Sequence, residues 1–266
     1  MKMDIKIIIA THKKYEMPRD SIYLPLHVGA EGKGDLGYAR DNTGENISSK
    51  NPSFCELTGL YWAWKNLDAD YIGLVHYRRH FAGTKRGGSP FERILTKGEL
   101  QHMLSGCRIF VPEKRRYYIE SLYSHYQHTH YEEHLNQTRE LVAQMYSDYL
   151  PSYDRVMKRT YGYMFNMMIM ERRLLNEYCT WLFDILFALE KRSSMSSLSA
   201  FQGRFYGRVS EIIFNVWLDY QLEHGRVKRS EVKELPVVYT EKVNWRKKIL
   251  AFLKAKFFHK KYEGSF

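Results

Sequence analysis

Residues Cys55 to His80 read CELTGLYWAWKNLDADYIGLVHYRRH. This stretch predicts an amphipathic helix, a tight acidic turn, a buried strand over Tyr71 to Val75, and then a cluster of hydrogen-bond donors. Ligands of α/β proteins collect outside the carboxyl ends of strands, so the donors indicate a site. Adjacent arginines favour an anionic ligand, phosphate foremost. The donors are His76, Tyr77, Arg78, Arg79 and His80.

The helix that precedes this strand carries a start signal. Ser53 is the predicted N-cap, and Glu56, three residues later, completes a capping box. This pattern favours a structural role for Glu56 over a catalytic one. Together with the strand, the helix forms an αβ unit of a mostly parallel sheet.

Composition limits the class of protein. The chain has 266 residues, of which 44% are hydrophobic and 15% aromatic, and this excludes intrinsic disorder. A formal charge of +11 favours anionic partners, whether nucleotides, nucleic acid or an acidic membrane surface. Cys55, Cys107 and Cys179 lack the spacing of a zinc site or disulfide framework, which indicates a reduced, cytoplasmic protein. No stretch is long enough for a signal peptide core or a transmembrane helix.

A second polar strand end is predicted near the N-terminus. Ile5 to Ala10 is a β-branched run, and Thr11, His12 and Lys13 follow it. These side chains form either part of a site or a solvated loop. Pro18 to Asn51 is rich in glycine and charge, which predicts a long loop that could close over a ligand.

The second half of the chain predicts one more strand and two helices. The strand spans Tyr163 to Met170 and contains the polar Asn166, and a helix over Glu171 to Arg192 follows. Further on, Ser210 is a predicted N-cap that places Glu211 in the first turn of the last helix. Arg204 and Arg208, just upstream, add anion-binding capacity.

The segment Tyr117 to His134 is dense in tyrosine, histidine and glutamate. Imidazoles and carboxylates are metal ligands, but no HExxH or comparable spacing is present. The alternatives are an aromatic surface that contacts an acceptor sugar and ordinary packing.

The tail, Asn244 to Phe266, has an apolar stripe flanked by Lys and Arg. It suits either an anionic membrane surface or docking on the domain.

Five segments of the chain are distinctive: IATHK from Ile9, GENISSKNPSFCELTGLYWAWKN, YIGLVHYRRHF, FNMMIMERRLLNEYCTWLFDILF and GRVSEIIFNVWL. They resemble those of a known family, the bacterial capsular and exopolysaccharide biosynthesis glycosyltransferases. ELTGLYWAWKN and GLVHYRRHF are the most specific matches. This family was long classified as a domain of unknown function and includes galactofuranosyltransferases.

The resemblance implies an α/β, GT-A-like fold over residues 1–240, with a mostly parallel central sheet flanked by helices. It implies transfer of a hexosyl group, galactofuranosyl among the candidates, from a UDP-sugar to a lipid-linked oligosaccharide, and we expect inversion. The sequence pattern adds a basic amphipathic tail over 241–266, which would bind a cytoplasmic protein peripherally to the inner face of the cell membrane. The competing reading is a nucleic-acid-binding protein that uses a basic, aromatic-rich surface.

Within this resemblance each candidate residue has an expected role. Many GT-A enzymes hold a divalent metal with an Asp-x-Asp motif at a strand end, but this strand end has no carboxylate. Asp68-Ala-Asp70 precedes the strand and is a false match. We expect Arg78, Arg79 and His76 to replace the metal, so that Mn²⁺ or Mg²⁺ is compatible with activity but not required.

Inversion needs a base that deprotonates the acceptor hydroxyl. Glu211 is the first candidate, and Asp41 and Glu56 follow. Asn166 is expected to contact the acceptor sugar. The donor nucleotide is assigned to Thr11, His12, Lys13, His76, Tyr77, Arg204 and Arg208.

Overall fold

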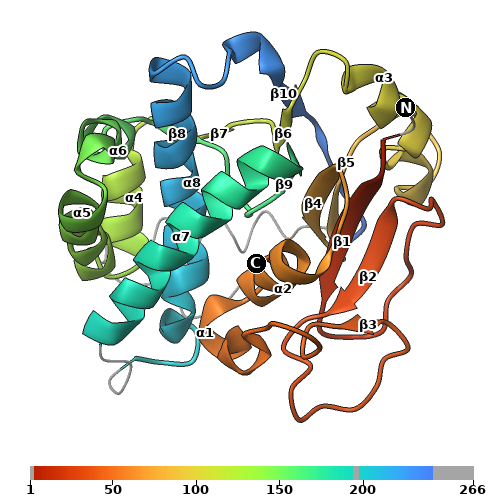
Figure 1. The fold of residues 1–266 in the computed structure, drawn as a ribbon, viewed down its shortest axis with the longest axis horizontal. Helices are drawn as coiled ribbons and strands as arrows, with labels where there is room; N and C mark the ends of the chain where they lie inside the picture. Colours follow the sequence, from red (N-terminus) through yellow and green to blue (C-terminus); the bar gives the residue numbers. More distant parts are fainter. Residues whose placement is uncertain (1–2, 194–197, 242–266) are drawn as a thin grey trace. The chain divides into compact units, whose positions relative to one another are not determined.

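The structure is a computed structural model that describes residues 3–193 and 198–241 (Figure 1). The tail predicted over Asn244 to Phe266 lies outside the described residues. The chain forms two compact units. Unit 1 contains the residues up to Glu113 together with Phe165–Cys179 and Val227–Glu241, and unit 2 contains Lys114–Met164 and Thr180–Arg226.

Unit 1 is built around a nine-stranded sheet. Its strands are β1 (Ile5–Thr11), β2 (Tyr23–His27), β3 (Ala39–Arg40), β4 (Tyr71–His76), β5 (Arg79–Phe81), β6 (Ile109–Pro112), β9 (Met168–Glu171), β10 (Val232–Leu235) and β11 (Val237–Tyr239). Its helices are α1 (Asn51–Phe54), α2 (Leu57–Asn66) and α3 (Lys97–Met103), with 3-10 turns η1 (Ser48–Lys50), η2 (Phe91–Arg93) and η5 (Arg229–Glu231).

The strand order is β10-β6-β9-β4-β1-β2-β3, with β5 paired to β4 and to β11. The ladders of β1 with β2 and with β4 are parallel, whereas β9 runs antiparallel to both β4 and β6. The predicted α/β fold, a central sheet flanked by helices, is confirmed, but the prediction of a mostly parallel sheet is wrong. The sheet is mixed, because β9 pairs antiparallel with β4 and β6, and β5 pairs antiparallel with β4 and β11. The predicted strands at β1 and β4 are confirmed as well.

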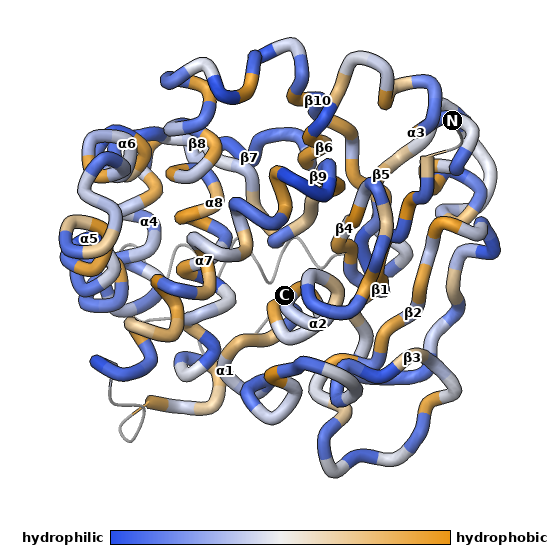
Figure 2. Tube along the Cα trace, viewed as in Figure 1, coloured by the Kyte–Doolittle hydropathy of each residue, from blue (hydrophilic) through white to orange (hydrophobic). Residues whose placement is uncertain are grey.

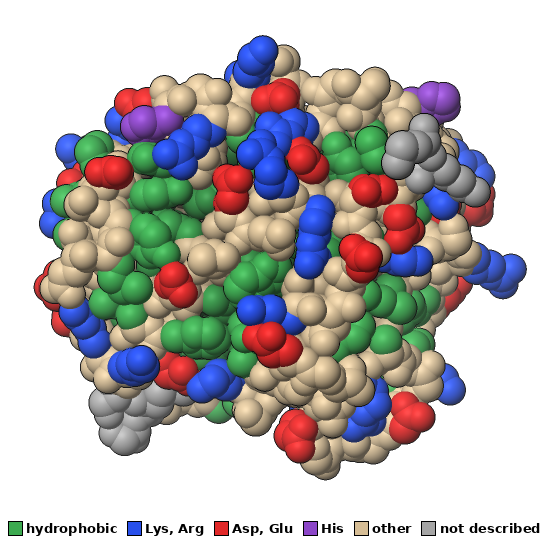
Figure 3. Space-filling model, in the orientation of Figure 1, with side chains coloured by type: hydrophobic (Ala, Val, Ile, Leu, Met, Phe, Trp, Pro, Cys, Tyr) green, Lys and Arg blue, Asp and Glu red, His purple; other side chains and the backbone are tan. Residues whose placement is uncertain are grey.

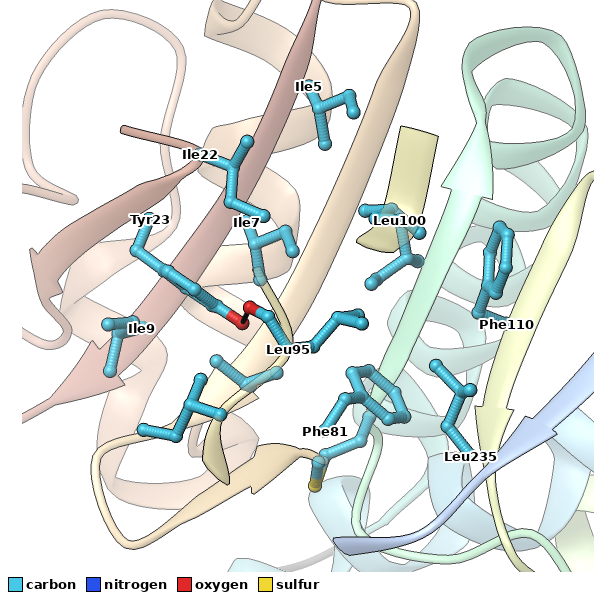
Figure 4. Packing of buried hydrophobic residues seen from close by; sticks show 14 of the residues in the cluster. Ile5, Ile7, Ile9, Ile22, Tyr23, Phe81, Leu95, Leu100, Phe110 and Leu235 are labelled. Atoms are coloured by element: carbon cyan, nitrogen blue, oxygen red, sulfur yellow. Dashed lines mark hydrogen bonds between the residues drawn. The ribbon is translucent and has the colours of Figure 1, made fainter. Parts of the chain in front are cut away.

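The two faces of β1 pack against different helices, as the period of a strand requires. Ile5, Ile7 and Ile9 join a buried cluster that includes Leu100 of α3 (Figure 4). On the opposite face, a side chain added at Gly59 of α2 would come within 3.3 Å of Ile8 Cδ1 and 2.8 Å of Val28 Cγ1. The missing side chain therefore allows α2 to lie close to the sheet. Figure 2 shows hydrophobic residues along much of β1 and β2.

The segment predicted as a long loop, 18–51, contains β2, β3 and η1 instead. Asp41 organises it: its fully buried carboxylate accepts hydrogen bonds from Gly29 N (2.7 Å), Ala30 N (3.0 Å), Ser48 Oγ (2.5 Å) and Thr58 Oγ1 (2.6 Å). Four donors around one carboxylate compensate for the loss of its hydration. Because these donors occupy its oxygens and no solvent reaches it, Asp41 is a structural residue and not a base for an acceptor.

We expect Asp41→Asn to destabilise the protein. The amide keeps one acceptor oxygen but turns an NH₂ group toward donors, and a lost hydrogen bond to a charged group costs about 1.5–3 kcal/mol. Urea denaturation would measure the change. Asp35→Asn, with the same charge change at an exposed position of the same segment, is the control. Equal stabilities of the two variants would contradict the structural role of Asp41.

Unit 2 is mainly helical. Its elements are β7 (Arg115–Arg116), α4 (Leu122–Thr129), α5 (Glu133–Met145), η3 (Ser147–Tyr149), α6 (Leu150–Met157), β8 (Tyr161–Gly162), η4 (Gln202–Arg204) and α8 (Phe205–Glu223). Helix α7 (Arg172–Arg192) confirms the helix predicted over Glu171 to Arg192; it begins in unit 1 and continues into unit 2. In unit 2, the Asn215 side chain of α8 bonds to both Tyr163 N (2.7 Å) and Tyr163 O (2.9 Å). None of the helices in the described part of the chain has the length and hydrophobicity needed to span a bilayer.

The strand predicted over Tyr163 to Met170 is wrong in its extent. Strand β9 begins only at Met168, because Phe165 and Asn166 adopt φ angles of 76° and 52°. Positive φ is uncommon for residues with a side chain and interrupts an extended strand. Asn166 therefore lies in a turn that leads into the sheet, and not in an acceptor-side strand.

Candidate functional site

The carboxyl ends of β1 and β4 meet at one edge of the sheet in unit 1. The two strands are parallel neighbours with Ala10 opposite His76, and Tyr77 N donates to Ala10 O at 3.2 Å. The polar residues after each strand are therefore adjacent. The structure thus brings the Thr11–Lys13 segment to the His76–Arg79 segment, although the predicted ligand roles stay predictions.

An aromatic ring lies at the centre of this edge. The Tyr77 ring has Lys13 Nζ 5.0 Å and Arg78 Cζ 5.3 Å from its centroid, and the His12 ring meets it edge-on at 5.4 Å. Thr11 is buried, and its hydroxyl donates to Lys13 O at 2.7 Å, which fixes the turn after β1. Cations over the face of tyrosine are attracted by its ring electrons. The ring thus holds cations of both segments together.

One carboxylate bridges these cations. Glu241 lies 3.4 Å from Lys13 Nζ and 3.6 Å from Arg78 Nη1, and all three side chains are between 37% and 47% exposed. Ion pairs this exposed contribute about 0–1 kcal/mol. An incoming phosphate could therefore take over both cations from Glu241 at little cost.

Arg79 is held by aromatic rings. Its guanidinium carbon lies 4.7 Å from the Phe165 centroid and 5.9 Å from the Tyr239 centroid. Among the described residues it has no carboxylate partner, and its Nε is buried without a hydrogen-bond acceptor. Stacking fixes the plane of a guanidinium while leaving its donors available. These donors can bind an anion.

Glu56 occupies the N-cap position of α2, but its side chain does not cap the helix and Ser53 is not an N-cap, so the capping-box prediction is wrong. Helix α1 ends at Phe54, Cys55 has φ 56°, and α2 starts after Glu56 with no side-chain cap. The Glu56 carboxylate instead accepts a hydrogen bond from Asn166 Nδ2 at 2.7 Å. Glu56 and Asn166 thus join the residues that follow β4. We call this set, His76 to Arg79 with Glu56, Phe165 and Asn166, the strand-end group.

His76 fixes the turn that carries Asn166. Its Nε2 lies 2.6 Å from Phe165 O, and because a carbonyl only accepts, Nε2 carries the proton. Burial lowers the pKa of His76, and the Glu56 carboxylate opposes that shift only in part. The ring is therefore neutral at pH 7, with Nδ1 as an acceptor. A contact from His76 to a diphosphate would require protonation of Nδ1.

The sequence places His80 with the site donors, and this is wrong. The chain turns back after β4, so that His76 pairs with Arg79 and β5 starts there. Successive residues of β5 face opposite ways. His80 is completely buried with its ring 6.0 Å from Tyr23, and burial lowers the pKa of His80 to about 4.

The remaining candidates, Arg204, Arg208 and Glu211, belong to unit 2. Helix α8 starts at Phe205, so Ser210 is not an N-cap and Glu211 is not in the first turn. Ser210 Oγ instead donates to Gly207 O at 2.8 Å. Arg204 is exposed, whereas Arg208 is half-buried, stacks 4.2 Å from the Phe201 centroid and donates to Phe201 O. Arg204 precedes α8, whereas Arg208 and Glu211, three residues apart, lie on one side of that helix.

Hydrogen bonds and ring contacts connect the histidines of the segment Tyr117 to His134 to neighbouring residues of unit 2. The buried Glu120 accepts from His125 Nδ1 (2.7 Å) and His128 Nδ1 (2.8 Å). His130 bonds to Gln202 at 3.0 Å, and His134 stacks on Phe205 at 3.8 Å. Burial lowers the pKa of His130 to about 2. These contacts support packing as the role of the segment.

Carboxylates, histidines and cysteines do not gather into a metal-binding group in the described ranges. Asp70 lies before β4, at its amino end, and its carboxylate accepts from Asp4 N at 2.7 Å. It therefore helps to hold β1 beside β4, at the opposite end of the strand from Arg78 and Arg79.

Figure 3 shows acidic and basic side chains interspersed on one face of the molecule, without the continuous basic stripe typical of nucleic-acid binding.

Comparisons with known proteins agree with this architecture. A solved structure of the bifunctional glycosyltransferase WbbM is similar to the chain, with a TM-score of 0.83 and 31% sequence identity. The match covers 90% of this chain and 46% of that chain, so the chain spans about half the length of that protein. No curated protein matches. The model of the family described as "Domain of unknown function (DUF4422)" matches residues 6–222, and the chain therefore belongs to this family.

Proposed function

We propose that the chain is a glycosyltransferase that moves a hexosyl group, galactofuranosyl among the candidates, from a UDP-sugar to a lipid-linked oligosaccharide. Capsular or exopolysaccharide synthesis is the process in which it would act. The observation that carries this proposal is the strand-end group of unit 1, where Arg78 lies over Tyr77, Arg79 lies over Phe165, and the next residue, Asn166, binds the half-buried Glu56 carboxylate. Similarity to WbbM, a bifunctional glycosyltransferase, supports the reaction class.

In this proposal the cations of unit 1 bind the leaving diphosphate. Arg78 and Arg79 donate to its oxygens as the bond from the anomeric carbon to the diphosphate breaks, and Lys13 adds a positive charge. Thr11, His12 and Tyr77 shape the nucleotide side. Arg204 and Arg208 stay proposed donor contacts on sequence grounds.

Two carboxylates are candidates for the base that takes the acceptor proton. Glu56 is the one we favour, because Asn166 orients it within the same unit as Arg79. Its oxygen would accept the proton while the acceptor oxygen attacks the anomeric carbon, which inverts the configuration. Asn166 would then also contact the acceptor sugar. Glu211 of unit 2 is the second candidate.

A thermal-shift screen tests the donor class and the role of metal together. UDP and UDP-sugars should raise the melting temperature more than GDP, dTDP or CMP ligands, because a ligand of the native state stabilises it. The shift should persist in EDTA, since arginines take the place of a cation. A shift that appears only with Mn²⁺ would contradict the metal-free site, and equal shifts with all nucleotides would contradict the UDP assignment.

The proposed acceptor lies at the inner face of the cell membrane. The chain has a formal charge of +11, which favours an anionic surface. The tail from residue 241 onward remains our proposed membrane contact on sequence grounds.

A further inference from the structure

The turn Tyr117–Ile119 of unit 2 exposes two large apolar side chains in succession. Tyr118 is 80% and Ile119 73% exposed, whereas the next most exposed large hydrophobic residue in the described ranges, Met145, is 42% exposed. Exposed apolar side chains are ordinary when scattered singly. Two adjacent ones, almost wholly in solvent, need a reason.

The backbone presents these side chains in a strained conformation. Tyr118 has φ 58°, and Ile119 N donates to Tyr117 O at 2.7 Å, which closes a three-residue turn. Such turns with positive φ are rare, and for a residue with a side chain they cost roughly 1–3 kcal/mol. Strain of this kind persists where surrounding contacts enforce it.

The surrounding contacts are in place on both sides of the turn. Before it, Tyr117 N donates to Thr160 O at 2.7 Å, and the Tyr117 ring lies 4.3 Å from that of His125. After it, the buried Glu120 accepts from His125 and His128. The turn is therefore anchored to α4 and to the segment leading into β8, and its exposed tip is held outward.

Cations lie directly beside the exposed tip. Lys114, Arg115 and Arg116 precede the turn, and β7 pairs with β8, which follows Lys158 and Arg159. Arg116 and Lys158 are exposed. The acidic groups nearby are Glu113, which is exposed, Glu120, which is bonded to two histidines, and Asp219, which is paired with Arg155 and Arg159.

We propose that residues 114–119 form a contact site for an anionic membrane surface. Ile119 enters the boundary of the acyl chains, Tyr118 lies among the headgroups, and Lys114, Arg115 and Arg116 bind lipid phosphates. Two apolar side chains are too few for a stable protein interface, whereas peripheral membrane binding combines few apolar residues with several cations. The site depends neither on the predicted tail nor on the transfer reaction.

Vesicle cosedimentation of the full chain tests the site. Vesicles of phosphatidylglycerol and phosphatidylethanolamine provide the anionic surface, and phosphatidylcholine vesicles provide a neutral one. Tyr118→Gly with Ile119→Ser should weaken anionic-vesicle binding about tenfold, by removing apolar contacts with the bilayer. Glycine suits the positive φ at 118, so this variant should fold normally. Met145→Ser, an exposed apolar residue elsewhere in unit 2, should bind as the wild type does.

A second comparison separates the loop from the tail. Arg115→Gln with Arg116→Gln should reduce binding to anionic vesicles and leave binding to neutral ones unchanged. Each loop variant is also measured with the tail cations changed to Gln, so that strong tail binding cannot hide its effect. Unchanged binding of the Tyr118/Ile119 variant to anionic vesicles in both backgrounds would overturn the proposal. This holds even if the variant lost turnover on a soluble acceptor, because that loss would assign the loop to the reaction and not to the membrane. The tail cations are Lys242, Arg246, Lys247, Lys248, Lys254, Lys256, Lys260 and Lys261.

Discussion

Replacing Arg79 by alanine should lower kcat for sugar transfer by about 10²–10³ while leaving the protein folded. The guanidinium is stacked against Phe165 and Tyr239, and no carboxylate among the described residues neutralises it. Stacking positions its donors before any ligand binds, and in the proposed function charge develops beside them on the leaving diphosphate. Steady-state transfer from the UDP-sugar identified by thermal shift measures the effect.

Two further variants separate the role of Arg79 from its charge. Arg79→Lys keeps the charge but loses the planar group that stacks on Phe165, so we expect it to recover only part of the activity. Arg86→Ala removes an exposed arginine of the same unit and should have no effect. If Arg79→Ala were to transfer sugar at the wild-type rate, the diphosphate site would lie elsewhere.

Two near-continuous apolar runs were sufficient to predict the edge of the sheet at which the candidate site lies. The run Ile5 to Ala10 is apolar except for Lys6, and the run Tyr71 to Val75 carries no charge, which is typical of strands buried on both faces. Both runs end in polar residues, and parallel neighbours bring such ends together. The approach of Lys13 to Tyr77 is the direct result.

The place of Glu56 could not be predicted from local sequence. Its spacing from Ser53 fits a capping box, and that pattern carries no information about Cys55, whose φ of 56° ends α1 one residue earlier. The partner of Glu56 is Asn166, 110 residues away in sequence. Contacts at such separation are set by the fold of the whole unit, so a local motif assigned the carboxylate to the wrong task.

The N-cap predicted at Ser210 is a second case in which a local motif gave the wrong helix start. A serine followed by a glutamate resembles a helix start, but the helix begins at Phe205, where η4 leads directly into α8. Residues on both sides of Ser210 are buried, and their packing keeps the chain helical before and after this predicted N-cap. Local capping preferences are worth about 1 kcal/mol and are readily overridden by burial of this extent.

Replacing Glu56 by glutamine should lower transfer by about 10²–10⁴ without weakening donor binding more than slightly. The glutamine oxygen can still accept the hydrogen bond from Asn166 Nδ2, so the geometry of the group is kept. What is lost is the ability to take a proton from the acceptor hydroxyl. Transfer rates and the thermal shift caused by the donor, measured on one preparation, separate these two effects.

The same change at Glu211 is the matched comparison, because both residues are half-exposed glutamates that have been assigned the role of base. If Glu56 is the base, Glu211→Gln should retain transfer within a few-fold of the wild type. The reverse pattern, an active Glu56→Gln and an inactive Glu211→Gln, would move the base to α8 and require that unit 2 supply it. Loss of donor binding in Glu56→Gln would instead make the carboxylate a support for the turn that carries Asn166, since His76 and Glu56 both hold that turn from unit 1.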